Sequence, residues 1–162
     1  MIKKLALSLT ALLASATPAI ASPHTAIRNS DLTRVLERTG VNVLTSHPEC
    51  QSDPSYGFYS PGRRLVVICV GQHYVNGKMD YSELGDTLRH EAIHVAQVCN
   101  GGGYDAVPIL SWSTISKYST PDILRQVLKY PEEVQHVEYE AFTSAYNLSN
   151  DQVEGIVVDY CF

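Results

Sequence analysis

The sequence predicts an α+β domain, in which a small, mostly antiparallel sheet is followed by a helical C-terminal half. Three observations support this fold class. Alternating and continuously apolar runs, which are typical of β-strands, are confined to residues 41–70. Apolar residues at helical spacing dominate from residue 82 onward. The length of 162 residues suits a single hydrophobic core, so we expect one domain.

The first 21 residues have the features of a secretory signal peptide. Lys3 and Lys4 give a basic start, a short apolar run follows, and Ala19-Ile20-Ala21 has the small residues of a cleavage site. A membrane anchor is the alternative, but an apolar run of about a dozen residues is too short to span a bilayer. We therefore expect a mature domain of residues 22–162 that is secreted or periplasmic.

The first helix and strand are predicted directly after this segment. Residues 29–40 fit a short helix, because Asn29 or Ser30 can cap its start and Gly40 can end it. Residues 41–46 alternate and are rich in valine, which predicts a strand.

Two further strands are expected after a polar loop at residues 47–55. They lie within residues 56–70 and are joined at Ser60-Pro61-Gly62. The second of them, residues 65–70, is apolar at every position.

The helices of the second half are punctuated by clear start and stop signals. Residues 83–99 form a predicted helix that Ser82 can cap and that the Asn100-Gly101-Gly102-Gly103 run ends. A short helix within a long loop fits the ambiguous segment that follows. Three more helices are then expected, at residues 120–130, 131–148 and 149–160.

Four cysteines remain in the predicted mature chain: Cys50, Cys69, Cys99 and Cys161. Export to an oxidising compartment favours two disulfides, and three pairings are open. We favour Cys50 with Cys69 and Cys99 with Cys161, because the second bridge would tie the C-terminus to the end of the helix at 83–99. Cysteine as a zinc ligand is the alternative, but the chain has no C-x-x-C pair.

The charge distribution limits the partners of the protein. The formal net charge is −5, and acidic and basic residues are interspersed. No basic stripe of the kind that binds nucleic acid is present. We expect neither a nucleic-acid partner nor a membrane partner after signal cleavage.

Residues 90–94 have the sequence His-Glu-Ala-Ile-His and fall inside the predicted helix at 83–99. Each helical residue turns about 100°, so His90, Glu91 and His94 share one face. Two imidazoles one turn apart can bind one ion, and a catalytic zinc site adds a third protein ligand and an open position for water. Glu91 would then be the general base. The alternative is a helix whose histidines only form hydrogen bonds in the core or face solvent.

The candidates for a third ligand are His136, Glu138 and Glu140. On a helical wheel Glu138 lies at the centre of the apolar arc, so we expect it to point into the core. His136 and Glu140 share the polar side, which predicts that both face solvent. A buried carboxylate needs a cation, and a zinc ion would supply it. The alternative partner is a buried salt bridge with Arg89 or Arg125.

The run His90-Glu91-x-x-His94, followed by Glu138-Tyr139-Glu140-Ala141, resembles the gluzincin group of zincin metallopeptidases. That group carries H-E-x-x-H on one helix and a later Glu, often followed three residues on by Ala, on a second helix. The resemblance implies that His90, His94 and Glu138 bind Zn²⁺ and that Glu91 activates a water.

The same resemblance extends to the strands before the motif. Residues 56–70 look like the zincin sheet, which implies a zincin-like fold whose edge strand receives an extended substrate, here expected at residues 65–70. The segment from Arg89 to Cys99 also resembles small bacterial and phage proteins that carry R-H-E-x-x-H-x-x-Q-x-C.

Three features depart from the family pattern. In the gluzincins an Asp or Asn often follows the Ala that corresponds to Ala141. This chain has Phe142 there, so a polar contact from that position is absent. No further His follows His94 at the metzincin spacing. The residue that would stabilise an oxyanion is not assigned by the pattern, although Tyr104, Tyr130 and Tyr139 are candidates.

Together these patterns predict a secreted zinc-dependent peptidase that acts on a peptide or protein substrate. Glu91 would take a proton from the attacking water and pass it to the leaving amine. One alternative is a catalytically inactive, zinc-stabilised binding or structural module on the same scaffold. A second is a secreted helical protein that binds no metal.

Overall fold

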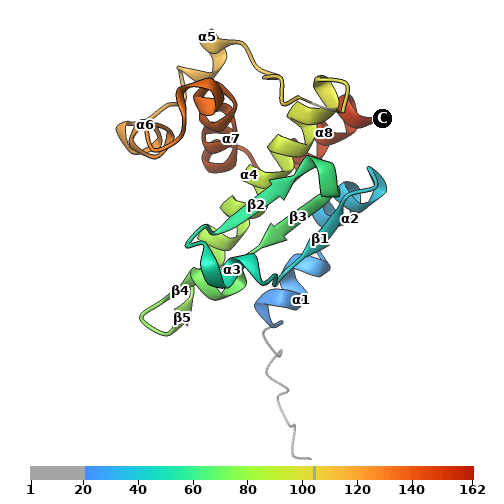
Figure 1. Ribbon diagram of the computed structural model, residues 1–162, viewed down its shortest axis with the longest axis vertical. Helices are drawn as coiled ribbons and strands as arrows, with labels where there is room; N and C mark the ends of the chain where they lie inside the picture. The colour runs from blue at the N-terminus through green and yellow to red at the C-terminus, as the bar shows by residue number, and fades with distance from the viewer. Residues whose placement is uncertain (1–20, 104) are drawn as a thin grey trace, which may run out of the picture.

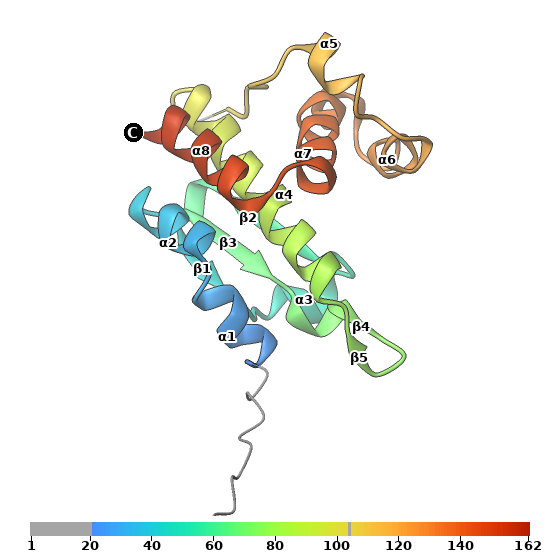
Figure 2. The same ribbon diagram turned by 180° about the vertical axis from the view of Figure 1, so that it is seen from behind.

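The sheet and the helices form two layers in the computed structural model, with the sheet in front in Figure 1 and the long helix α4 behind it. Figure 2 shows α2, α4 and α8 on the opposite side of the sheet from the viewer of Figure 1. The structure describes residues 21–103 and 105–162. The predicted signal peptide therefore lies outside the described residues, apart from Ala21.

The first part of the chain contains the strands. Its elements are, in chain order, α1 (Pro23–Arg28), α2 (Asp31–Arg38), β1 (Asn42–Leu44), α3 (Glu49–Ser52), β2 (Gly57–Ser60), the 3₁₀ helix η1 (Pro61–Arg63), β3 (Leu65–Ile68), η2 (Val70–His73), β4 (Tyr74–Val75) and β5 (Lys78–Met79).

The second part of the described chain is helical. Its elements are α4 (Tyr81–Asn100), α5 (Trp112–Ile115), α6 (Pro121–Val127), η3 (Glu132–Val134), α7 (Gln135–Asn147) and α8 (Asn150–Cys161). The predicted α+β class is confirmed. Each predicted helix and strand has a counterpart, and α1 is an additional helix that starts at a Ser22 cap followed by proline.

The three-stranded sheet has the order β1-β3-β2, with β3 in the centre. β2 is antiparallel to β3, and β1 is parallel to it, because α3 and β2 lie between them in the chain. The expectation that residues 65–70 form an edge strand is therefore wrong. A run that is apolar at every position marks a strand covered on both faces, which is a central strand.

Both faces of β3 are indeed buried. Val66 and Ile68 belong to the main core, which also contains residues of α2, α4 and α8. Leu65 and Val67 face the other side of the sheet, where they pack against Cys50 and Phe58.

The helix α4 starts earlier than the sequence indicated. Its N-cap is Asp80, whose carboxylate accepts hydrogen bonds from the backbone N–H groups of Ser82 and Glu83. Ser82 is therefore not the cap. An aspartate cap also places a negative charge at the positive end of the helix, which favours this start.

The helix α4 contributes many residues to the main hydrophobic core. Ala92 and Ala96 of α4 and Ala141 of α7 are fully buried in the main core, and these small side chains allow the two helices to approach closely. A second, smaller cluster joins α5, α6 and α7 on the outer side of α7. The His-Glu-Ala-Ile-His motif at residues 90–94 therefore lies on a helix that is largely buried in the core.

Two disulfides join Cys50 to Cys69 and Cys99 to Cys161. This is the pairing favoured from the sequence. Disulfides persist in oxidising compartments, which agrees with the predicted export. Within the described ranges, the hydropathy of the helices falls below what a membrane-crossing segment requires.

Candidate metal centre

Two helices bring three potential metal ligands together. His90 and His94 lie one turn apart on α4, and Glu138 comes from the first turns of α7. All three side chains are largely buried, with exposed fractions of 11–14 %. These residues form a group that can hold a metal ion, since one donor atom of each lies within 4.8 Å of the others.

The donor atoms are separated by distances close to those of a tetrahedral metal centre. The Nε2 atoms of His90 and His94 lie 3.0 Å apart. Glu138 places Oε2 at 3.3 Å from His90 Nε2 and Oε1 at 3.4 Å from His94 Nε2. In a tetrahedral site with metal–ligand bonds of about 2.0–2.1 Å, the ligand atoms lie about 3.3–3.4 Å apart. The two imidazoles and the Glu138 carboxylate thus lie at nearly the separations of such a site, with each imidazole facing a different oxygen of the carboxylate.

The protonation of these three groups reflects their burial and their mutual contact. Burial lowers the pKa of His90 to about 4, so this imidazole is neutral at pH 7. Burial also acts to lower the pKa of His94, but the adjacent Glu138 carboxylate outweighs it and raises the value to about 9. Burial would raise the pKa of Glu138, yet the two imidazoles hold it at about 2. Glu138 is thus ionised, and in the metal-free protein the imidazolium of His94 balances its charge.

Glu91 lies beside this group, with an exposed fraction of 4 %. Burial raises its pKa to about 7. Its Oε2 atom is buried and has no hydrogen-bond partner among the described residues. A buried carboxyl group that titrates near neutral pH is suited to accept and return a proton.

A chain of hydrogen bonds behind His94 fixes the orientation of its ring. The Nδ1 atom of His94 lies 2.7 Å from Gln97 Oε1, and the Nε2 group of Gln97 donates to Glu140 Oε2 at 2.8 Å. Since an amide oxygen only accepts, Nδ1 carries the proton and Nε2 is left to face the other donors.

The prediction that Glu140 faces solvent is wrong. Glu140 is 1 % exposed, and its carboxylate accepts hydrogen bonds from the backbone N–H groups of Ile109 and Leu110 as well as from Gln97. The loop before α5 covers this side of α7 and satisfies the charge. His136, the other residue expected at the surface, is exposed.

Sequence reasoning missed Gln97 and Glu140 as parts of the site. The signal for Gln97 was its position three residues after His94, which places it on the same face of the helix. No comparable local signal existed for Glu140, because its partners lie about 30 residues away in the chain.

The arginines considered as partners of Glu138 are engaged elsewhere. Arg89 pairs with Asp86 and donates to the backbone oxygen of Ala145, and Arg125 pairs with Asp122 at the surface. Arg89 and Arg125 are therefore wrong as salt-bridge partners of Glu138, and the carboxylate instead forms its ion pairs with the two histidines.

The metal-ligand group lies in a cleft of about 380 Å³. Its lining comes from α3 and the segment after it, from β2, from α4, from the turn after α6 and from α7: Glu49, Ser52, Asp53, Ser55, Gly57, Phe58, Tyr59, His90, Glu91, His94, Tyr130 and Glu138. Substrate-sized groups therefore have access to the donor atoms.

Of the three tyrosines considered as oxyanion donors, Tyr130 lines this cleft. Tyr139 is buried and stacks on Trp112 with ring centroids 5.0 Å apart, so it belongs to the second core cluster. Tyr104 lies outside the described residues. Burial, followed by the charges of Glu138 and Glu91, raises the pKa of Tyr130. Its phenol therefore keeps its proton and can donate a hydrogen bond.

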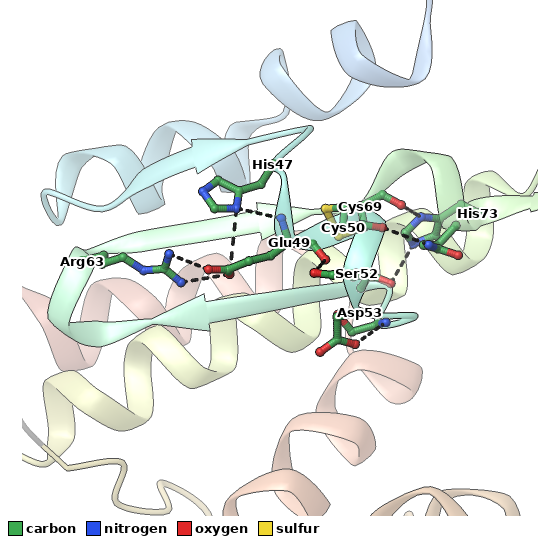
Figure 3. Close-up of a disulfide and its surroundings, with 11 residues drawn as sticks. His47, Glu49, Cys50, Ser52, Asp53, Arg63, Cys69 and His73 are labelled. Atoms are coloured by element: carbon green, nitrogen blue, oxygen red, sulfur yellow. Dashed lines mark hydrogen bonds and ion pairs between the residues drawn. A yellow bond between two sulfur atoms is a disulfide. The ribbon is translucent and has the colours of Figure 1, made fainter.

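One wall of the cleft is held by a disulfide. Figure 3 shows Cys50 of α3 bonded to Cys69, the residue that follows β3. Glu49 on the same short helix pairs with Arg63 at 2.9 Å, and the backbone oxygen of Cys50 accepts a hydrogen bond from Gln72. These contacts fix α3 against the sheet at the rim of the cleft.

Comparison with known proteins identifies the family to which the chain is related. A family model described as a domain of unknown function, DUF8637, matches residues 23–162. The chain belongs to this family. Neither the curated proteins nor the solved structures contain a match to the chain. The DUF8637 span runs from α1 through α8, so the metal-ligand group and both disulfides lie inside the DUF8637 domain.

Proposed function

We propose that the chain is a zinc-dependent peptidase with a zincin-type active site of the gluzincin kind. His90, His94 and Glu138 would hold Zn²⁺, and Glu91 would be the general base. One observation carries the proposal: two histidines and a glutamate from two helices bring their donor atoms close enough to hold one metal ion in an open cleft, next to a buried carboxyl group.

The donor set fits zinc better than the hard divalent cations. Two imidazole nitrogens and one carboxylate oxygen form a known set of protein ligands in catalytic zinc sites. Calcium prefers six to eight oxygen ligands, and magnesium prefers near-octahedral oxygen coordination. The Oε2 atom of Glu138, which is buried and has no hydrogen bond within the described part of the chain, also supports a bound cation.

When bound, the ion supplies Lewis acidity to the scissile carbonyl and to the attacking water. The chain's own residues supply the proton transfers. Glu91, with a pKa of about 7, is partly ionised at neutral pH and accepts the proton of the water. It then returns this proton to the leaving amine. Gln97 and Glu140 keep the ring of His94 in one orientation during the cycle.

The substrate backbone would pair with β2. This strand ends the sheet order β1-β3-β2, so one of its edges has no neighbouring strand from the part of the chain that the structure describes. Gly57 of β2 lies next to Glu91, since a Cβ at this position would be 3.4 Å from Glu91 Oε1. An extended peptide added to this edge would cross the metal-ligand group. Tyr130, on the cleft lining, would donate to the developing oxyanion.

The proposal is tested by metal analysis and peptide digestion. Purified, oxidised protein is expected to bind one zinc ion per chain and to cleave a mixed peptide library, with cleavage lost on chelation and restored by zinc. Glu91→Gln is expected to keep the zinc and lose cleavage by at least a hundredfold, and Glu138→Ala to lose both. Glu133→Gln, an exposed change of the same chemistry, is the control.

Two outcomes would contradict the peptidase. A protein that takes up no zinc would refute the metal site itself. A protein that binds zinc and gains thermal stability but cleaves no peptide would instead be a zinc-stabilised binding or structural module. In that case Glu91→Gln would change neither metal content nor function.

A further inference from the structure

A second cavity, of about 160 Å³, adjoins the cleft and is called the side pocket here. It shares five lining residues with the cleft: Ser55, Gly57, His90, Glu91 and Tyr130. The side pocket extends from Glu91 toward the N-terminal half of α4, where Glu83, Asp86 and Thr87 line it. A group bound in the side pocket would thus be next to the reacting atoms.

Aromatic side chains form another part of the lining of the side pocket. This aromatic wall is formed by Tyr56, Tyr130, Phe142 and Tyr146. Phe142 and Tyr146 are nearly parallel, with an angle of 17° between their rings, and Tyr130 meets Phe142 edge to face. Aromatic faces attract cations and also pack against the methylene stems of long side chains.

The floor of the side pocket carries carboxyl groups without enough cations to balance them. Asp86 pairs with Arg89, but Glu83 has no ion-pair partner among the described residues. No lysine or arginine lines the pocket in the described chain. Burial, followed by the charges of Asp86 and Asp80, raises the pKa of Glu83.

A further unpartnered group faces the same space. Glu91 also lines the side pocket, is 4 % exposed, and its Oε2 atom accepts no hydrogen bond from residues 21–103 or 105–162. The pocket therefore combines a negative floor, an aromatic wall and a buried polar atom that has no partner. Such a site favours a positively charged ligand.

We propose that the side pocket binds the positively charged side chain of a lysine or arginine residue of the peptide substrate, next to the bond that is cleaved. The aromatic wall would hold the methylene stem, and Glu83 with Asp86 would hold the ammonium or guanidinium. This specificity rests on the proposed peptidase function.

Distance along α4 favours a side chain over an amino terminus as the source of the charge. Glu83 lies eight residues before Glu91, which is about 12 Å along the helix axis, and Asp86 about 7 Å. One extended residue spans at most about 3.6 Å, so the α-amino group of the residue at the cleaved bond does not reach these carboxylates. A lysine side chain extends further on its four-carbon stem.

The test uses a series of short peptides that differ at one position beside the cleaved bond. This residue is lysine, arginine, norleucine or glutamate, and each peptide is made with a free and an acetylated amino terminus. With the zinc-loaded wild type, kcat/KM is expected to be at least tenfold higher for lysine and arginine than for norleucine, and lowest for glutamate. Acetylation is expected to leave this preference unchanged.

Two variants complete the design. In Glu83→Gln the ratio of kcat/KM for the lysine peptide to that for the norleucine peptide is expected to fall at least fivefold. Glu37→Gln, which removes an exposed charge on α2, is the matched control and is expected to keep the wild-type ratio. Thermal unfolding of each variant checks that the fold is intact.

The outcomes separate the side pocket from the peptidase. Cleavage without preference for a cationic residue would overturn the side pocket and leave the peptidase standing. A preference that needs a free amino terminus would overturn the side-chain assignment. If the wild type cleaves no peptide, calorimetric titration with the same intact peptides decides: tighter binding of the lysine peptide than of norleucine supports the pocket, and equal binding overturns it.

Discussion

Glu138 and Glu140 lie two residues apart on α7, and both leave the solvent for different reasons. Two residues are about 200° apart on a helix, so the two carboxylates point in nearly opposite directions. Glu138 faces the two imidazoles of α4, and Glu140 faces the backbone of Ile109 and Leu110. One carboxylate is a potential ligand, and the other supports a ligand through Gln97.

Replacing Glu140 tests this supporting role. Glu140→Gln replaces a charged acceptor of two backbone N–H groups by a neutral amide, so we expect a loss of about 2 kcal/mol in the free energy of unfolding. Zinc affinity is expected to fall about 10- to 100-fold, because the ring of His94 is less firmly held. Denaturant unfolding and a zinc titration measure the two effects.

The control for this experiment is Glu133→Gln, which changes an exposed carboxylate on η3. It is expected to change neither quantity. Loss of stability without any loss of zinc affinity would show that Glu140 only fastens the loop to α7.

Glu91 makes the stability of the metal-free protein depend on pH. Its pKa is raised from 4.5 to about 7, so the folded state resists ionisation of a group that ionises freely in the unfolded chain. This destabilises the fold above pH 4.5, increasingly up to about pH 7, and not below. We expect Glu91→Gln to stabilise the metal-free protein by about 1–3 kcal/mol at pH 8 and by almost nothing near pH 4.

Denaturant unfolding of wild type and Glu91→Gln at the two pH values, with chelator present, measures this difference. The comparison is free of the metal, which would contribute its own stabilisation. An equal effect at both pH values would show that the charge of Glu91 costs the fold nothing.

At the scale of elements, the close contact of β2 with α4 requires a residue without a side chain at Gly57. A Cβ at Gly57 would lie 2.8 Å from Thr87 Cγ2 and 2.8 Å from the backbone oxygen of Val67, and backbone cannot move aside cheaply. Gly57→Ala is therefore expected to displace β2 from α4. We expect a loss of about 1–3 kcal/mol in unfolding free energy and a larger loss in kcat/KM.

The turn between β2 and β3 offers a matched control. A Cβ at Gly62 would meet no atom within 4 Å, so Gly62→Ala is expected to leave stability and activity close to wild type. Thermal unfolding and peptide cleavage measure both variants. A Gly57→Ala protein with wild-type kinetics would refute the role of β2 as a wall of the active site.

The elements themselves were largely predictable from local patterns. The caps at Ser30 and Thr120 place α2 and α6 where the structure has them, and the turn residues Ser60-Pro61-Gly62 place the β2–β3 connection. The strand order was not predictable in the same way. It depends on which strand is covered on both faces. The continuous apolar run of β3 is the feature that marks it as the central strand.

The sequence predicted those site residues whose position follows from the periodicity of a single helix. His90, Glu91 and His94 follow from one motif, and the inward direction of Glu138 follows from a wheel. Glu140 could not be placed, because a helical wheel assigns it to the solvent-facing side of its own helix. The wheel contains no information on the distant loop that donates two backbone N–H groups to this carboxylate. The role of Glu83 and Asp86 in the side pocket was likewise not predictable, because β2 and α7 contribute the other parts of its lining.

For the whole molecule, a bound ion would connect two cores. The main core contains α4 and the sheet, and the smaller cluster holds α5 and α6 against α7. We expect zinc to slow amide hydrogen exchange more in α6 and α7 than in α1 and β1, because local opening of α7 breaks the metal site. Hydrogen exchange followed by mass spectrometry, with zinc and with chelator, measures the difference.

Glu138→Ala is the control for this measurement, since it is expected to abolish the zinc-dependent change. Protection that rises equally in all elements would indicate that α7 does not open by itself. Zinc would then stabilise only the global fold.

The bridge between Cys50 and Cys69 affects how the protein must be prepared. It fastens α3 to the sheet, and α3 carries part of the cleft rim but none of the metal ligands. Material made in a reducing cytoplasm, or stored with dithiothreitol, would keep its histidines yet lose the shape of the opening above them. Such a sample could bind metal and still cleave no peptide. Its free-thiol content is therefore the first quantity to measure before a negative cleavage result is accepted.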